Sequence, residues 1–253
     1  MEATAFEVLR NGVVLAELGG YGDGPYCAEH GKGTALVVLG TYIIDPGEDV
    51  PYDPRFVFKP GRKNFAAYLA DHVAAARPSG ARVAVSVCAN DLADNVEFLQ
   101  AARDTGADIV SYCAHSTMAM FLAKNTSSAL CRREFWPELR RWAETFRREL
   151  DVPCIFKLGY RDTPDTLSAV EILTNAGIQC VHVNVHRTDP DSVGLEVIAK
   201  LKGKTPFLLA GGGIKDLDGA RRALAAGADA VAVGTAAMHD PTFCGQLQKQ
   251  LNP

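Results

Sequence analysis

The chain has 253 residues, of which 47% are hydrophobic, and a formal net charge of −4 at pH 7. This length suits one large domain with a sizeable core, and the acidic balance argues against binding to nucleic acid through a basic surface. No basic region followed by an apolar run opens the chain, and no apolar run is long enough to span a membrane. The seven cysteines are scattered without a C-x-x-C pair, as is typical of free thiols in a reducing compartment. We therefore expect a cytoplasmic protein.

The N-terminal region predicts a β-hairpin. Two apolar runs, residues 6–9 and 13–18, flank Asn11 and Gly12, a strong two-residue hairpin signal. The next strand is expected at residues 35–39. Residues 41–59 follow as a long loop rich in Pro, Asp and Gly, and loops of this length are usually functional.

The rest of the chain repeats a strand followed by a helix, with a larger helical segment at residues 117–150 that is broken near Pro137. Further strands are expected at residues 82–88, 108–112, 153–158, 179–184, 207–210 and 230–233, and helices at 64–76, at 92–105 and from about 164, 191 and 216. Strands that each lead into a helix form a parallel sheet, and eight of them favour closure into a barrel. We predict an α/β fold, a single (β/α)8 TIM barrel over residues 1–253, with the N-terminal hairpin at its bottom.

Two glycine-rich turns follow the last two predicted strands. They contain Gly211, Gly212 and Gly213 in the first turn, and Gly234 with Thr235 in the second. Glycine lets backbone N–H groups approach an anion, and barrels of this kind commonly hold a phosphate at their last two turns. The sequence predicts a phosphate site here, although glycine is also common in ordinary turns.

Polar residues at the other strand ends are candidates for chemistry, because barrel enzymes build their sites there. Lys157 stands in an apolar run, where a buried ammonium needs an anionic or electron-rich partner. It is a candidate for stabilising negative charge or for forming a Schiff base. Asn184 lies one strand further on, at a matching height.

Cys113, His115 and Ser116 form the most reactive cluster, and each is a candidate for moving a proton. The alternative is that Cys113 is a core residue and His115 a structural histidine. His182, Asn184 and His186 share one strand face, but no further ligand stands at a suitable spacing. We therefore expect no metal.

These residues resemble the FMN-binding barrels of the dihydroorotate dehydrogenase and dihydrouridine synthase superfamily, nearest to the short archaeal-type dihydrouridine-synthase-like proteins. The resemblance covers about residues 13–241. It implies FMN as the cofactor, with Lys157 at the flavin ring and the glycine turns at the FMN phosphate. The residues that the resemblance assigns to FMN are Ala16, Glu17, Leu18, Ser86, Lys157, Asn184, Gly211, Gly212, Gly213, Gly234 and Thr235.

The sequence also departs from that family. The family's strand-four cysteine, a general acid, is replaced by Ser116, an asparagine by Cys113, and an arginine after the last glycine by Thr235. The helical domain with which the tRNA enzymes grip RNA has no counterpart after the barrel. The departures argue against tRNA reduction.

The leading hypothesis is an FMN-dependent oxidoreductase acting on a small cyclic C=C or dihydro-heterocycle, in which Lys157, Cys113, His115 and Ser116 are catalytic candidates. The alternatives are a cofactor-free phosphate-binding lyase or isomerase that uses Lys157, and a degenerate barrel without catalytic activity. In each case we expect a small-molecule ligand, no functional binding to nucleic acid or membrane, and a possible homo-oligomer.

Overall fold

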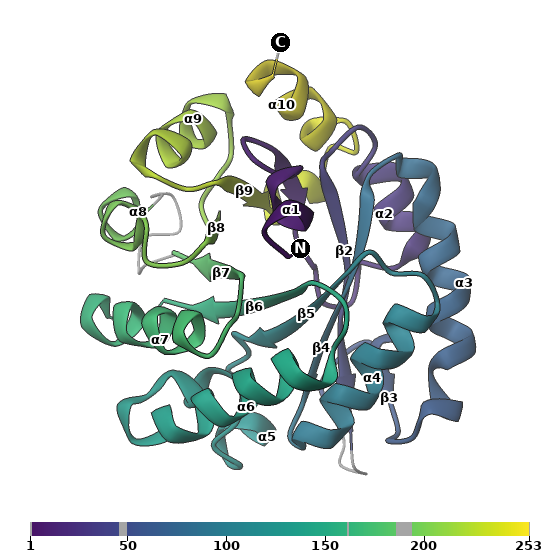
Figure 1. Cartoon of the computed structure of the whole chain (residues 1–253). Helices are drawn as coiled ribbons and strands as arrows, with labels where there is room; N and C mark the ends of the chain where they lie inside the picture. The colour runs from purple at the N-terminus through teal and green to yellow at the C-terminus, as the bar shows by residue number, and fades with distance from the viewer. Residues whose placement is uncertain (1, 46–49, 161, 186–193, 253) are drawn as a thin grey trace.

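Nine parallel strands form one sheet in the computed structural model, which describes residues 2–45, 50–160, 162–185 and 194–252 (Figure 1). The strands are β1 (Val13–Leu15), β2 (Leu36–Ile44), β3 (Val57–Phe58), β4 (Arg82–Ala89), β5 (Ile109–Ala114), β6 (Cys154–Gly159), β7 (Cys180–Asn184), β8 (Phe207–Gly211) and β9 (Ala230–Val233). Their order is β1-β9-β8-β7-β6-β5-β4-β2-β3, and the additional pairing of β1 with β2 closes eight of them into a barrel. The predicted TIM barrel is confirmed.

Helices surround the barrel (Figure 1). The α-helices are α1 (Glu2–Glu7), α2 (Gly24–His30), α3 (Ala66–Ala76), α4 (Leu92–Asp104), α5 (Ala119–Leu122), α6 (Trp136–Glu149), α7 (Thr163–Asn175), α8 (Leu195–Leu201), α9 (Leu217–Ala226) and α10 (Phe243–Leu251). Helix α2 was not expected, although its start is encoded locally. Asp23 Oδ1 accepts a hydrogen bond from the Tyr26 N–H at 3.0 Å, and Pro25 occupies the first turn. Pro137 likewise stands in the first turn of α6 and does not break a longer helix.

The predicted N-terminal hairpin is wrong, because its first segment is helical. Residues 2–7 form α1, and Asn11, with φ of +57°, then turns the chain into β1, which pairs in parallel with β2 and β9. Phe6, in α1, and Leu9, in the turn that follows it, are both buried, and the Leu9 N–H donates to the Phe6 carbonyl oxygen at 2.8 Å. They pack at the end of the barrel interior, where the rings of Phe6 and Phe207 lie 5.9 Å apart. The segment closes the barrel bottom as expected, but as a helix.

Alternation along the strands separates two layers of core. Small and branched side chains such as Val14, Leu36 and Ala84 point into the barrel, and their neighbours in sequence pack against the outer helices. Strand β2 runs on to Ile44, and β3 lies within the predicted loop of residues 41–59, so that loop is shorter than expected.

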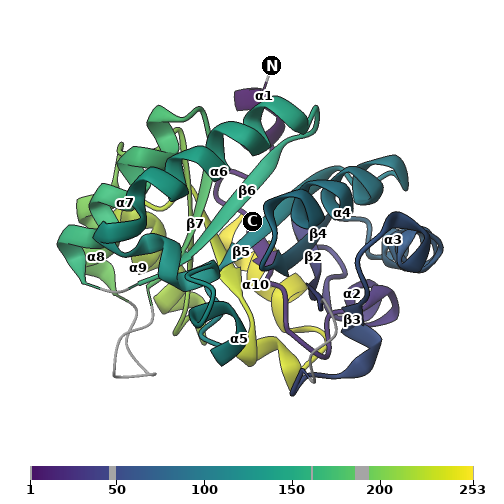
Figure 2. The same cartoon turned by 90° about the horizontal axis from the view of Figure 1, so that it is seen from below.

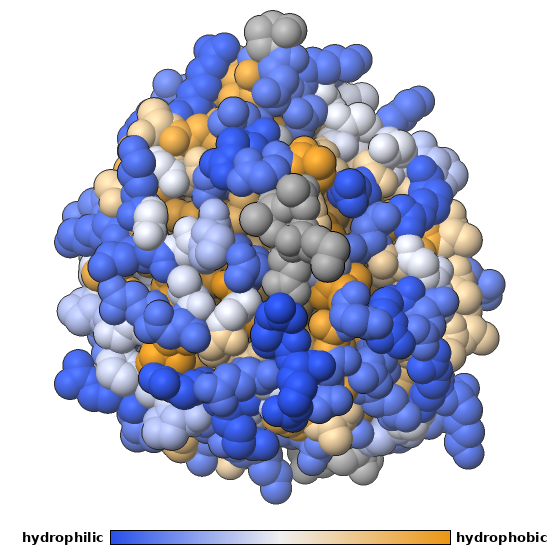
Figure 3. Space-filling model, in the orientation of Figure 1, coloured by the Kyte–Doolittle hydropathy of each residue, from blue (hydrophilic) through white to orange (hydrophobic). Residues whose placement is uncertain are grey.

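The two ends of the barrel differ. Helix α1 lies at the amino ends of the barrel strands, which are uppermost in Figure 2. Helix α5 lies at the opposite end, to which the carboxyl ends of the strands point. The face around α1 is mostly hydrophilic, with small separate apolar spots (Figure 3). In the described ranges, no helix combines the length and apolarity needed to cross a bilayer.

Candidate active site

A cavity of about 910 Å³ opens at the carboxyl ends of the barrel strands. This size is at the upper end of the range for small-molecule sites. The lining includes most of the residues singled out in the sequence, namely Ala16, Glu17, Leu18, Cys113, His115, Ser116, Lys157, Asn184, Gly211, Gly212, Gly213, Gly234 and Thr235. The barrel thus brings the predicted residues together at one end.

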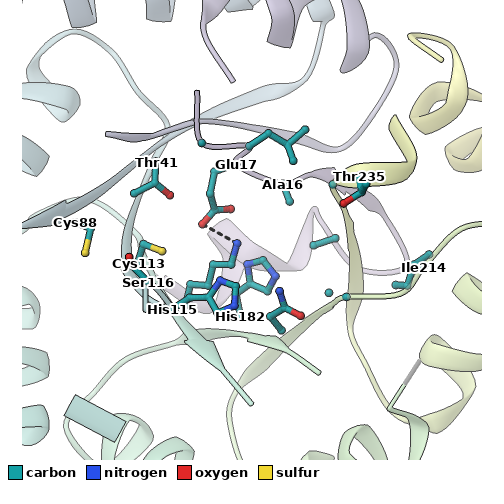
Figure 4. A pocket seen from close by; sticks show the side chains of 18 of the residues that line it. Ala16, Glu17, Thr41, Cys88, Cys113, His115, Ser116, His182, Ile214 and Thr235 are labelled. Atoms are coloured by element: carbon teal, nitrogen blue, oxygen red, sulfur yellow. Dashed lines mark ion pairs between the residues drawn. The ribbon is translucent and has the colours of Figure 1, made fainter. Parts of the chain in front are cut away.

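A buried ion pair crosses the centre of this cavity (Figure 4). Lys157 Nζ lies 3.1 Å from Glu17 Oε1, and the two side chains are only 7% and 3% exposed. Lys157 comes from β6, and Glu17 follows β1. Taking both charges out of water is costly, so the pairing is required for either side chain to be held there. The sequence predicted an anionic or electron-rich partner for Lys157, but it did not identify Glu17 as that partner.

Two hydroxyl groups support Glu17 from below. Ser86 Oγ donates to Glu17 Oε1 at 3.4 Å, and Thr41 Oγ1 lies 3.3 Å from Ser86 Oγ. Ser86 is completely buried and is not part of the cavity lining. It therefore supports the carboxylate, and the sequence-based expectation that it touches a bound ring is not supported by its position.

Two histidines lie close to Lys157. His182 is beside Lys157 in the strand register, and burial first, then the charges of Lys157 and His115, hold the pKa of His182 well below its ordinary value. Its imidazole is therefore neutral at neutral pH. A Cβ on Gly211 would lie 2.7 Å from His182 Nε2, and a Cβ on Gly159 would lie 2.6 Å from His115 Cδ2. The two glycines leave room for the two rings.

Cys113 lies on the other side of Lys157 in the register. Burial raises the pKa of its thiol, and this effect outweighs the opposing charge of Lys157. A protonated, buried thiol is a poor nucleophile and a weak acid at neutral pH. Ser116 Oγ accepts a hydrogen bond from the Met118 N–H at 3.3 Å. The catalytic roles predicted for Cys113, His115 and Ser116 remain predictions.

The two glycine turns form one side of the cavity, which we name the glycine end: Gly211, Gly212, Gly213, Gly234 and Thr235. Gly212 and Gly213 have φ values of +97° and +76°, in the region that favours glycine. In the described part of the chain, their N–H groups make no turn or loop hydrogen bond to a carbonyl. Asp216, in contrast, caps α9 by accepting from the Gly219 N–H at 2.7 Å. The turn amides, more than the α9 terminus, are therefore available to an anion.

The opposite side of the cavity is mostly apolar, and the hydroxyl-bearing side chains of Thr41 and Ser116 also lie there (Figure 4). We name it the apolar end, and its residues are Ile43, Tyr52, Cys88, Cys113, Met118 and Phe121. The Tyr52 hydroxyl donates a hydrogen bond to the Thr41 carbonyl oxygen at 3.1 Å. Gly19, which has no Cβ, leaves the space that the Tyr52 ring needs. Apart from Cys113, the sequence did not mark these side chains, because they come from loops and apolar strand ends without a recognisable motif.

No group of three or more His, Cys, Asp or Glu side chains in the described ranges is arranged to hold a metal ion. His186, considered above as a third residue of a metal-binding strand face, lies outside the described residues.

Comparisons with known proteins divide between sequence and fold. A family model described as histidine biosynthesis protein matches residues 156–253, fewer than half of the chain. The chain is 34% identical over 71 residues to geranylgeranylglyceryl phosphate synthase of Methanopyrus kandleri, a match that spans 28% of this chain and 30% of that protein.

Two solved structures resemble the whole barrel. DHODH from Eimeria tenella, in complex with ferulenol, matches with a TM-score of 0.67 and 15% identity, over 94% of this chain and 80% of that one. FabK (M276A) from Thermotoga maritima matches with a TM-score of 0.58 and 14% identity, over 92% of this chain and 64% of that one. At these identities the likeness establishes the fold alone. The expected resemblance to dihydroorotate dehydrogenases is supported in fold. The sequence matches are to a histidine biosynthesis family model and to a geranylgeranylglyceryl phosphate synthase.

Proposed function

We propose that the protein is a TIM-barrel enzyme that acts on a phosphorylated carbonyl compound as a lyase or isomerase without a cofactor. The observation that carries this proposal is the buried pair of Lys157 and Glu17, which lies inside a large cavity next to two glycine turns. The pair provides an acid–base centre, and the turns provide a place for the phosphate.

Phosphate binding is supported by the backbone of the glycine end and by the sequence matches. Gly212 and Gly213 have no Cβ to keep an anion away from their N–H groups, and Lys215 lines the same side of the cavity. The family match to residues 156–253 includes Lys157 and both glycine turns. The name of the curated relative contains a phosphate ester. These sequence matches favour the phosphate-binding alternative over the FMN hypothesis.

The chemistry follows from two opposite charges held side by side. The ammonium of Lys157 polarises a substrate carbonyl, and the carboxylate of Glu17 takes the proton from the neighbouring carbon. The resulting enolate is stabilised by Lys157. In an isomerase the proton then returns from Glu17 to a different carbon; in a lyase the enolate re-forms the carbonyl, a C=C bond forms, and the leaving group on the next carbon departs with its bonding electron pair. Alternatively, Lys157 passes a proton to Glu17 and its free amine adds to the carbonyl, which forms a Schiff base with loss of water.

FMN is the second candidate, supported by the family resemblance and by the fold. When bound, it would supply hydride chemistry, and its phosphate would be held by Gly212, Gly213, Gly234 and Thr235. The residues fit the phosphate better than the reduced ring. The lysine expected to offset the negative charge of reduced flavin is bonded to Glu17, so the pair has no net charge to offer. We therefore derive no step through FMN.

Proton exchange tests the proposal directly. A panel of carbonyl phosphates is incubated with the protein in D2O, and exchange at the carbon next to the carbonyl is followed by NMR. Glu17→Gln and Lys157→Met are expected to abolish exchange. Glu171→Gln and Lys204→Met, which break a surface Lys–Glu pair, are expected to leave it unchanged. Borohydride trapping on Lys157 distinguishes the Schiff base from simple polarisation.

The FMN hypothesis has a separate test. A yellow preparation, or tight binding of added FMN, combined with no exchange across the panel would overturn the proposal in favour of the oxidoreductase. A colourless protein that fails to bind FMN would remove the flavin candidate.

A further inference from the structure

We propose that the substrate carries an uncharged apolar group on the side of its carbonyl away from the phosphate, and that the apolar end of the cavity binds this group. This inference rests on the proposed function and adds the shape and polarity of the substrate to it.

The strand order places the two ends of the cavity on opposite sides of the barrel mouth. In the closed order β1, β2, β4, β5, β6, β7, β8, β9, strands four places apart face each other across the axis. Strands β8 and β9, which carry the glycine turns, therefore face β4 and β5, which carry Cys88 and Cys113. Figure 4 shows the same arrangement, with Ile214 and Thr235 on one side of the mouth and Cys88 and Cys113 on the other.

The ion pair lies between these two ends. Its residues also come from opposite strands, since β1 faces β6 in the closed order. In Figure 4 the ion pair of Glu17 crosses the middle of the mouth. A ligand with its phosphate at the glycine end and its carbonyl at Lys157 therefore extends toward the apolar end.

The side chains at the apolar end favour an uncharged group. Ile43, Cys88, Cys113 and Phe121 are buried in one cluster, and Met118 packs against it. Among the described residues that line the cavity, the charged ones are Glu17, Lys157 and Lys215, and none of them belongs to the apolar end. The buried thiols add no charge there, because burial also raises the pKa of Cys88 well above its ordinary value. A charged substituent would lose its hydration here without a charged partner in return. A hydroxylated one would meet the hydroxyls of Thr41 and Ser116, which are already hydrogen-bonded to Ser86 Oγ and the Met118 N–H.

Met118 suits a site that adapts to an apolar ligand. It is half-buried at the start of the segment leading into α5, and its flexible thioether fills irregular space. It is therefore the position at which the polarity of the apolar end is changed with least risk to the fold.

A chain-length series tests the proposal. Isothermal titration is carried out with inorganic phosphate and with 2-oxoalkyl phosphates from 2-oxopropyl to 2-oxooctyl phosphate. Inorganic phosphate probes the glycine end alone. Each methylene that reaches the apolar end is expected to tighten binding about fourfold until the space is filled. A hydroxylated 2-oxo phosphate of similar length is expected to bind more weakly than its alkyl counterpart.

Three variants connect the effect to this end of the cavity. Met118→Asn is expected to abolish the gain per methylene without changing the affinity for inorganic phosphate, and Met118→Leu to preserve it. Phe121→Leu, which enlarges the space, is expected to shift the best chain length upward. Phosphate binding with no gain along the series, tighter binding of the hydroxylated ligand, or a gain that survives Met118→Asn would overturn this inference alone. Failure of inorganic phosphate and of every ester to bind would overturn the proposed function instead.

Discussion

Replacing Glu17 by glutamine removes one charge of the buried ion pair and changes the shape of the side chain very little. Lys157 then keeps its ammonium in a site where it is 7% exposed, with an amide in place of the carboxylate 3.1 Å away. Because the remaining charge has lost its counter-charge in a poorly solvated position, we expect the folded state to lose stability.

The magnitude follows from the burial of both partners. Removing one member of a buried pair costs about 3–5 kcal/mol, since the other charge is left uncompensated. The exposed pair of Lys204 and Glu171 provides a matched control, because its side chains are 45% and 48% exposed and its Nζ–Oε1 distance is 2.7 Å. For Glu171→Gln the expected cost is about 0–1 kcal/mol.

Urea denaturation of the four proteins of a double-mutant cycle measures this effect. Glu17→Gln and Lys157→Met are each expected to be destabilising, whereas the double variant carries no buried charge and should recover most of the loss. For a chain of this size, a loss of about 3 kcal/mol also lowers the melting temperature by roughly 6–12 °C. Equal costs for Glu17→Gln and Glu171→Gln, or single effects that simply add in the double variant, would refute the reasoning.

Four further expectations concern other parts of the molecule. The pKa of His182 is depressed in the folded state, so its contribution to the free energy of unfolding is complete above the unfolded pKa of about 6.5 and is lost as the pH falls below that value. Stability should drop by up to about 1.4 kcal/mol per pH unit in this range, and the slope should disappear in His182→Asn. Gly212→Ala places a side chain at a φ of +97° and should cost about 1–2 kcal/mol in urea denaturation, a value that an unstrained turn would not produce. Iodoacetamide should alkylate Cys113 at pH 8 at least about tenfold more slowly in the folded protein than in urea, and comparable rates would show that the thiol is accessible. Filter binding with bulk tRNA at near-physiological salt should reveal no functional affinity, because the net charge is −4. Submicromolar binding that is lost when Arg140 and Arg141, two of the arginines on α6, are changed to Glu would contradict this.

The barrel itself was predictable from local sequence patterns. Eight apolar runs, six of them followed by a helical pattern, indicate parallel strands, and Gly212 and Gly213 mark a turn that needs positive φ values. The strand-end position of Lys157 likewise follows from the rule that barrel sites form at the carboxyl ends of strands. The N-terminal segment was mispredicted because Asn11 and Gly12 suit a tight turn after a helix as well as a turn between two strands.

The partners within the site were decided only by the tertiary structure. Glu17 and Lys157 belong to strands at opposite sides of the barrel, and they meet because the sheet closes on itself. Ser86 was expected to contact a ligand, but in the folded barrel its hydroxyl donates to Glu17 and does not line the cavity. Strand periodicity and turn preferences depend on a few neighbouring residues, so a sequence displays them directly. Burial, the pairing of charges and the polarity of each end of the cavity depend on distances across the barrel, and these arise only when distant strands come together.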